Sequence, residues 1–108
     1  LIAVQNQFSP SHPDPAHTMG HCADLGLDFV CWSPLGGFLD AFDSHAYDPF
    51  RTVAAARGVS YQRVVLAWEL TRYDRLFTIP SARNPHEVQD SFAAVNLTLA
   101  PEELALLP

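Results

Sequence analysis

The sequence predicts an α/β fold with parallel strands and crossover helices, in the form of a partial (β/α)8 TIM barrel. Three short apolar segments, 1–6, 27–33 and 75–80, have the composition of buried strands. Helical segments lie between them, and strands connected in this way run parallel. A complete barrel takes about 250 residues. The 108 residues of this chain are therefore enough for roughly the last three-eighths of one.

The loop after the first strand, 9–17, contains three prolines and leads into a predicted helix at 16–26. Gly26 is suited to end that helix, because glycine readily adopts the left-handed conformation of the residue after a helix. The second strand is followed by 34–49, which shows neither helical nor strand periodicity. We therefore expect a long loop there.

Helix-start signals mark the two segments before the third strand. In 48–58, Asp48 is the expected N-cap and Pro49 stands at the first helical position. Ser60 is the expected N-cap of the next helix, 61–73, which carries apolar residues on one face. These two helices should cross over from the second strand to the third.

Two more helices are predicted after the third strand. In 84–95, Asn84 is the expected N-cap, and Glu87 is placed to complete a capping box. In 100–108, the cap position holds Ala100, which has no side-chain acceptor. We expect this last helix to fray at its start.

The three strand segments are apolar along their length. Parallel strands of this composition are usually covered by helices on both faces of the sheet. Three strands cannot close a barrel, so an open sheet of this size would leave two long edges. The sequence thus predicts a sheet covered on both faces and unpaired at both edges.

Charge and composition exclude several classes of function. The formal net charge is −6 and the chain contains no lysine, so no basic surface for nucleic acid is expected. No apolar run approaches the ~18 residues of a membrane span, and no signal peptide is visible. The chain opens on Leu1 in a strand-like run, which suggests a start inside a longer protein. We expect a cytoplasmic protein in which Cys22 and Cys31 are reduced, buried thiols.

The five histidines do not predict a metal site. His17 and His21 have helical spacing but lack the intervening glutamate of a zinc motif, and the others lie in loops or near a helix start. Trp68, in the middle of a helix, is expected in the core. Ser33 has no evident His and Asp partners, so a nucleophilic role is not expected.

Polar or aromatic side chains stand where each strand ends. In parallel α/β proteins, ligands bind at the carboxyl ends of the strands, and these ends share one edge of the sheet. We therefore expect these side chains to contribute to one binding site. They are Gln5, Asn6, Trp32, Ser33, Ser81 and Arg83.

Two of these strand ends could form a phosphate cradle. Arg83 precedes a helix that starts at Asn84, and a guanidinium beside free backbone N–H groups suits an anion. The turn at 33–37 contains two glycines, which let a ligand approach the backbone closely. The alternative is that these glycines only serve the geometry of the turn.

Five segments stand in a characteristic order along almost the whole chain. They are VQNQFSP (4–10), FVCWSPLGG (29–37), GVSYQRVVLAWEL (58–70), IPSARNPHEV (79–88) and VNLTLAPEEL (95–104). This series resembles the C-terminal third of an aldo-keto reductase. The resemblance implies strands six to eight of a (β/α)8 barrel, with 1–108 as one segment of a single domain. It also implies an enzyme that reduces aldehydes or ketones with NADPH.

The resemblance implies roles for residues toward the nicotinamide and the pyrophosphate. Gln5 would hydrogen-bond the nicotinamide carboxamide, and Trp32 would stack on the nicotinamide ring. Ser33, Leu35 and Gly37 would line the pyrophosphate. Plain burial in a core is the competing interpretation of Trp32.

The resemblance also implies the adenosine end of the site. Ser81 and Arg83 would lie at the 2′-phosphate, and Glu87, Asp90 and Ser91 around the adenosine. Glu87 departs from the Arg or Gln of many members, and an acid there would repel a phosphate. Asp90 is shorter than the usual Glu, and Ser91 replaces a common Asn.

The family's catalytic Asp, Tyr, Lys and His belong to earlier strands, so by this resemblance the chain contains no catalytic residue. Its expected partners are the missing N-terminal part of the barrel and a small carbonyl substrate, with no nucleic acid and no membrane. Several alternatives stay open. The chain could be a non-catalytic truncated fragment, an NADPH-binding regulatory subunit similar to potassium-channel β subunits, or a stand-alone module that oligomerises to cover its edges.

Overall fold

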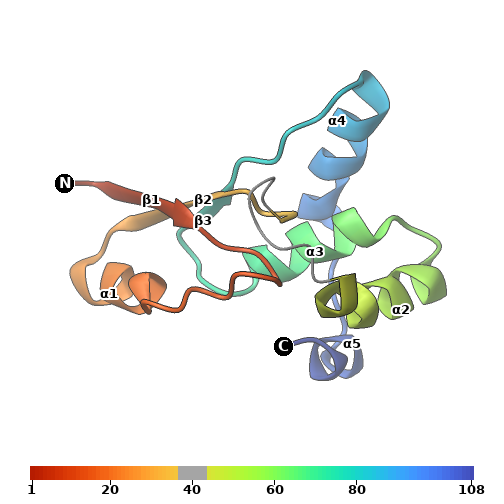
Figure 1. The fold of residues 1–108 in the computed structure, drawn as a ribbon, viewed down its shortest axis with the longest axis horizontal. Helices are drawn as coiled ribbons and strands as arrows, with labels where there is room; N and C mark the ends of the chain where they lie inside the picture. Colours follow the sequence, from red (N-terminus) through yellow and green to blue (C-terminus); the bar gives the residue numbers. More distant parts are fainter. Residues whose placement is uncertain (37–43) are drawn as a thin grey trace.

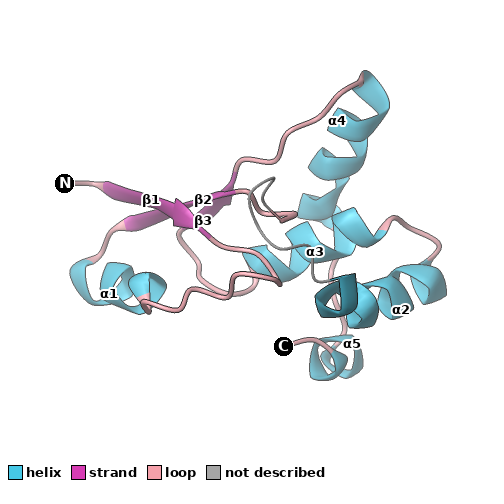
Figure 2. Ribbon diagram, in the orientation of Figure 1, coloured by secondary structure: helices cyan, strands magenta, loops and turns pink. Residues whose placement is uncertain are grey.

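The computed structural model describes residues 1–36 and 44–108, which contain a three-stranded parallel sheet (Figure 1, Figure 2). The strands are β1 (Ala3–Gln7), β2 (Asp28–Trp32) and β3 (Leu76–Thr78), and β2 lies between the other two. Both neighbouring pairs of strands are parallel. The predicted α/β fold is confirmed, with a third strand shorter than expected.

Helices occupy the connections between the strands and most of the chain after β3 (Figure 1). Two short 3-10 helices, η1 and η2, directly precede α2 and follow α4. The bounds are α1 (Thr18–Leu25), η1 (Ser44–Tyr47), α2 (Asp48–Arg57), α3 (Tyr61–Leu70), α4 (Pro85–Phe92), η2 (Ala93–Asn96) and α5 (Pro101–Leu106).

Three of the predicted helix ends are confirmed. Gly26 follows α1 with φ 68°, and its N–H donates to carbonyl groups of the last helical turn. The Ser60 hydroxyl caps α3 by accepting from the backbone N–H of Arg63 at 3.1 Å. The Asn84 side chain caps α4 by accepting from the N–H of Glu87 at 2.9 Å. Each end is determined by residues within one turn of the helix.

The start of α2 differs from the prediction. Asp48 is the first residue of the helix, and Tyr47 stands at the N-cap position without a side-chain hydrogen bond. The Asp48 carboxylate instead accepts from Arg51 at 3.2 Å. The reason is that η1, within the segment expected to be a loop, already has helical backbone and leads directly into α2.

The residue that caps α1 lies earlier in the chain than the usual N-cap position. His17 stands at the N-cap position and makes no side-chain cap bond. Both carboxylate oxygens of Asp14 accept from the first turn, from the N–H of Thr18 at 3.0 Å and that of Met19 at 2.9 Å. The proline-rich loop therefore folds back to satisfy this helix end.

The start of α5 has half of a capping box. Ala100 provides no side-chain acceptor, as expected, but Glu103 accepts from the N–H of Ala100 at 2.8 Å. Glu103 also pairs with Arg57 of α2 at 2.8 Å. The fraying of this helix stays a prediction.

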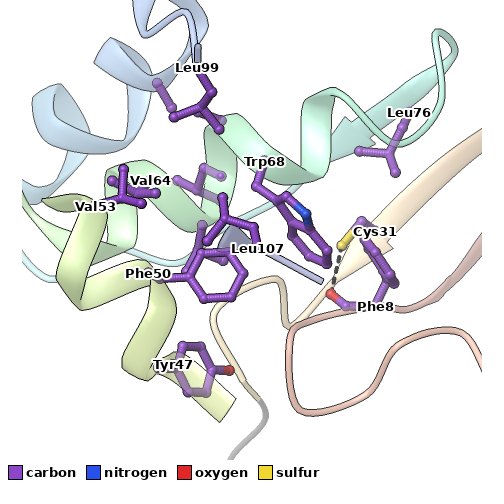
Figure 3. Packing of buried hydrophobic residues seen from close by; sticks show 14 of the residues in the cluster. Phe8, Cys31, Tyr47, Phe50, Val53, Val64, Trp68, Leu76, Leu99 and Leu107 are labelled. Atoms are coloured by element: carbon purple, nitrogen blue, oxygen red, sulfur yellow. Dashed lines mark hydrogen bonds between the residues drawn. The ribbon is translucent and has the colours of Figure 1, made fainter. Parts of the chain in front are cut away.

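The buried side chains form one cluster between the sheet and the helices (Figure 3). Trp68 of α3 is 3% exposed, stacks on Phe8 at 5.5 Å between ring centroids, and meets the edge of Phe50 at 5.2 Å. The Cys31 thiol donates to the carbonyl of Phe8 at 2.9 Å (Figure 3). The placement of Trp68 in the core is confirmed.

Both cysteines agree with the prediction of buried thiols. Cys22 is 1% exposed and Cys31 is 0% exposed, and both are free. Burial is the largest cause that raises the pKa of each thiol. No helix within the described residues is long and apolar enough to cross a membrane.

The prediction that both faces of the sheet are covered is wrong for this chain. Side chains alternate along β2, and Phe29 and Cys31 are fully buried on the face toward the helices. On the opposite face, Trp32 is 37% exposed, Phe77 54% and Ile79 48%. We call this second face the open face. No element of the described chain covers it, because the helices lie on the other side.

Candidate functional site

The carboxyl ends of the three strands lie together, as the parallel sheet requires. Gln7, the last residue of β1, pairs in register with Trp32, the last residue of β2. Cys31 pairs with Thr78, the last residue of β3. The first strand thus ends one residue later than the predicted segment 1–6, and Gln5 lies within it, on the same open face as Trp32.

A hollow of about 500 Å³ opens beside these strand ends. It lies between the turn that follows β2 and the segment that follows β3. We call it the first hollow. Its lining consists of Ser33, Pro34, Leu35, Gly36, Ile79, Pro80 and Ser81.

The turn after β2 is tightly constrained. Ser33 has a positive φ of 50°, and the N–H of Gly36 donates to the Ser33 carbonyl at 3.1 Å. Gly36 has φ 100°, and a Cβ at this position would stand 2.7 Å from the hydroxyl of Tyr47. Both the conformation and the close approach require glycine. The geometry of the turn therefore explains Gly36 without any ligand, while the same residue lines the first hollow.

A second hollow of about 210 Å³ adjoins the first and lies between the start of α3 and α4. Leu35 and Ser81 line both hollows, so the two lie next to each other between the turn after β2 and α4, and we call them together the groove. The lining of the second hollow is Leu35, Ser60, Gln62, Ser81, His86, Glu87, Asp90 and Ser91.

Asp90 anchors the wall of the second hollow to α3. Its carboxylate accepts from Arg63 at 2.7 Å and 3.0 Å and from the hydroxyl of Ser60. Burial raises the pKa of Asp90, but the hydrogen bonds from Ser60 and Arg63 outweigh burial and hold this pKa below its ordinary value. Asp90 is therefore an ionised group whose charge is already matched.

Glu87 and Arg83 form a second ion pair at the start of α4. One oxygen of Glu87 accepts from the backbone N–H of Arg83 at 2.9 Å, and the other from its guanidinium at 3.2 Å and 3.3 Å. These bonds lower the pKa of Glu87. The capping box predicted with Asn84 is thus displaced by one residue, because Glu87 bonds to Arg83 and not to the N–H of Asn84.

Of the ten predicted cofactor residues, six line the groove, three described ones do not line it, and one lies outside the described residues. Gln5 and Trp32 lie on the open face and line neither hollow. Arg83 stands beside the second hollow, held by Glu87, and Gly37 lies outside the described residues. The six residues in the groove are Ser33, Leu35, Ser81, Glu87, Asp90 and Ser91.

Sequence reasoning missed several residues of the groove. Ser60 was assigned only a helix-cap role, yet it lines the second hollow and bonds to Asp90. The proximity of α3 and α4 is a tertiary contact between distant segments, so no local pattern shows it. Pro34 and Gly36 belong to the turn at 33–37 that was predicted as part of the phosphate cradle. The other residues missed are Gln62, Ile79, Pro80 and His86.

A third hollow, of about 290 Å³, has a more apolar lining than the groove. It lies between the segment after β3 and the outer side of α4. Phe92 is 72% exposed there, and Val88 and Val95 are also exposed. Its lining is Thr78, Pro80, Ala82, Val88, Ser91, Phe92 and Val95.

The described part of the chain, 1–36 and 44–108, contains no group of three or more His, Cys, Asp or Glu that could hold a metal ion. The groove instead combines a tight turn, small hydroxyl side chains and two paired carboxylates. This lining suits an extended polar ligand that lies across the carboxyl ends of the strands.

Comparison with known proteins identifies the family. The family model described as "Aldo/keto reductase family" matches residues 1–107. Pyridoxine 4-dehydrogenase of Escherichia coli (strain K12) is 31% identical over 107 residues, which are 99% of this chain and 36% of that protein. The chain thus spans about a third of the length of this curated relative.

Solved structures share the fold at lower identity. An aldose reductase from Giardia lamblia has a TM-score of 0.82 at 24% identity, covering 97% of this chain and 35% of that one. An aldo-keto reductase from Klebsiella pneumoniae, solved in complex with NADPH, has a TM-score of 0.76 at 24% identity, with coverage of 96% and 37%. The parallel sheet and its helices correspond to part of the (β/α)8 barrel of such proteins. This chain belongs to the aldo/keto reductase family.

Proposed function

We propose that this chain is the C-terminal, cofactor-binding part of an aldo/keto reductase whose intact form reduces an aldehyde or ketone with NADPH. Residues 1–108 would then be one segment of a single barrel domain and supply its last three strands. The observation that carries the proposal is the groove at the carboxyl ends of the strands, where two hollows share Leu35 and Ser81.

The groove offers a place for each part of a dinucleotide. The first hollow, with the tight turn at Ser33 and Leu35, would hold the pyrophosphate. The second hollow would hold the adenosine against Asp90 and Ser91 of α4. Bound NADPH supplies the hydride for a carbonyl carbon.

Two residues of the open face would receive the nicotinamide. Trp32 presents a partly exposed ring that could stack on it, and Gln5 is exposed on the same face. Arg83 would face the adenosine 2′-phosphate. The pyrophosphate contact of Gly37, which lies outside the described residues, stays a prediction. These residues bind and orient the cofactor in this proposal.

The group that protonates the substrate would come from the rest of the barrel. The chain contains no lysine. The Tyr47 hydroxyl is buried and shares a hydrogen bond with Ser11 at 3.2 Å, and the Tyr73 hydroxyl donates to the carbonyl of Leu27 at 2.7 Å. These tyrosines therefore serve the fold, which supports a binding role without a catalytic one.

The uncovered open face and the two unpaired sheet edges support the proposal that another segment of the barrel packs against this sheet. The described residues pair β1 and β3 only with β2, so each has one free edge. Phe77 and Ile79 leave apolar surface exposed beside those edges. The N-terminal part of a barrel would cover this surface. We place the intact enzyme in the cytoplasm, where free thiols such as Cys31 persist, and expect neither nucleic acid nor membrane as a partner.

Tryptophan fluorescence tests the proposal. NADPH is titrated into this chain and into the chain extended by its natural upstream segment. Quenching in both proteins would support the groove as a cofactor site, and Trp32→Phe should remove most of it while the buried Trp68 remains. Quenching in neither protein would contradict the proposal. Binding without carbonyl reduction by the extended protein would favour the regulatory-subunit alternative.

A further inference from the structure

The guanidinium best placed for a phosphate at the adenosine end already holds an anion. Arg83 donates to Glu87 from its backbone N–H at 2.9 Å and from its side chain at 3.2 Å and 3.3 Å. Glu87 itself lines the second hollow. The Glu87 carboxylate is ionised at neutral pH, and its bonds to Arg83 lower its pKa further. A negative charge therefore lines this hollow and is paired with Arg83, whose side chain is 90% exposed.

The other guanidinium beside the second hollow is also engaged. Arg63 donates twice to Asp90, at 2.7 Å and 3.0 Å. Lysine is absent from the chain. His86 also lines the hollow. Among the described residues, a phosphate entering here must compete with a carboxylate for each arginine.

We propose that Glu87 is a specificity-determining residue that competes with the 2′-phosphate of NADPH for Arg83. This inference rests on the proposed function. A carboxylate accepts hydrogen bonds from ribose hydroxyl groups, whereas it repels a phosphate dianion at the same position. The chain therefore distinguishes NADPH from NADH only weakly, and removal of the Glu87 charge sharpens the distinction.

The test uses ligands that represent the adenosine end alone. Adenosine 2′,5′-bisphosphate and 5′-AMP are titrated into the 108-residue chain and into Glu87→Gln by isothermal calorimetry. Glutamine keeps the length and an acceptor oxygen but removes the charge. We expect the bisphosphate to bind about threefold to fivefold tighter to Glu87→Gln, because Arg83 is 90% exposed and solvent screens its pair with Glu87. Binding of 5′-AMP should change by less than about twofold.

Two further variants make the result specific. Glu102→Gln removes one exposed carboxylate from α5, away from the groove, and should leave both affinities unchanged. In the Glu87→Gln background, Arg83→Gln should remove the gain for the bisphosphate while 5′-AMP still binds. Circular dichroism of each variant checks that the fold is retained.

The outcomes separate this inference from the function on which it rests. Equal affinity of the wild-type chain and Glu87→Gln for the bisphosphate would overturn the role of Glu87 and leave the cofactor site in place. A gain of the same size for 5′-AMP would also overturn it, because the effect would not depend on the 2′-phosphate. Failure of every variant to bind either nucleotide or NADPH would overturn the cofactor site itself.

Discussion

The two faces of the sheet carry similar side chains but differ in what covers them. Phe29 on the helix-covered face is 0% exposed and meets the Phe8 ring edge-on at 6.4 Å. Phe77 in the neighbouring strand points to the open face and is 54% exposed. Both residues belong to apolar strand segments of the same kind. The difference shows that apolar composition predicts a strand, whereas its cover depends on other parts of the chain.

Alanine substitutions on the two faces should give the largest effect. Phe29→Ala should lower the free energy of unfolding by about 3–5 kcal/mol, because it removes a fully buried ring. Phe77→Ala should lower it by about 1 kcal/mol or less, because most of the ring is already in water. Urea denaturation of both variants measures the difference.

A milder pair of substitutions tests the same comparison if Phe29→Ala does not fold. Phe29→Leu and Phe77→Leu keep an apolar side chain, and the covered face should again be the more sensitive one. Equal losses on the two faces would mean that the open face is buried in solution, for example between two copies of the chain. Light scattering would identify such an association.

The helix-covered side of the sheet contains a buried acid, Glu69, which is unfavourable in an apolar core. Glu69 of α3 is 0% exposed, and within the described chain its two carboxylate oxygens have no hydrogen-bond partner. Burial raises its pKa well above the ordinary value. Cys31 and Tyr47 face it from β2 and η1, and burial raises both of their pKa values, so they stay neutral with it. An uncharged Glu69 is the form that the core tolerates.

Stability should therefore fall as the pH rises. Above about pH 4.3 the unfolded chain releases the Glu69 proton while the folded chain keeps it. The contribution of Glu69 to the free energy of unfolding then falls by about 1.4 kcal/mol per pH unit, up to its raised pKa. Urea denaturation between about pH 5 and pH 7 measures this slope.

Glu69→Gln is the matched control, since it keeps the shape without a titrating group. The difference in stability between this variant and the wild-type chain should widen steadily with pH. A constant difference would show that Glu69 is ionised and has a partner in solution. Other carboxylates cancel in this difference because both proteins contain them.

The contact between α3 and α4, on the helix-covered side of the sheet, should show an intermediate effect. Asp90→Asn removes the charge through which α4 binds Ser60 and Arg63 at the start of α3. The Asp90 side chain is 17% exposed. We expect a loss of about 1–2 kcal/mol. The pKa of Asp90 is lower in the folded chain than in the unfolded chain. The contribution of Asp90 to the free energy of unfolding is therefore complete above its unfolded pKa, and it disappears as the pH falls through its folded pKa. Hydrogen exchange in α4 should rise more than in α2.

The smallest effect is expected at the outer surface. Arg57→Gln removes the exposed pair with Glu103 that ties α5 to α2. Global stability should change less than in Asp90→Asn, because solvent screens this pair. Exchange of the first amides of α5 should rise, since Glu103 would bridge only to Ala100. Unchanged exchange there would contradict a role for Arg57 in holding the helix.

The sequence by itself determined the elements and many of their ends. Gly26, Ser60 and Asn84 end or begin helices through bonds within a few residues, so local patterns were sufficient. The alternation of apolar strands with helices determined the parallel sheet. The ordered motifs indicated the family, which the family model confirms over residues 1–107.

Only the tertiary structure decided which of these surfaces meet. The groove exists because Leu35 and Ser81 come together from distant segments. The charge of Asp90 is matched because Arg63 of α3 lies against α4. Glu69 of α3 is buried near Cys31 of β2 and Tyr47 of η1, which are distant from it in the sequence. Local propensity acts over about one helical turn, whereas cover, clefts and charge pairing arise from contacts between residues far apart in the chain. This is why the elements could be predicted and the open face could not.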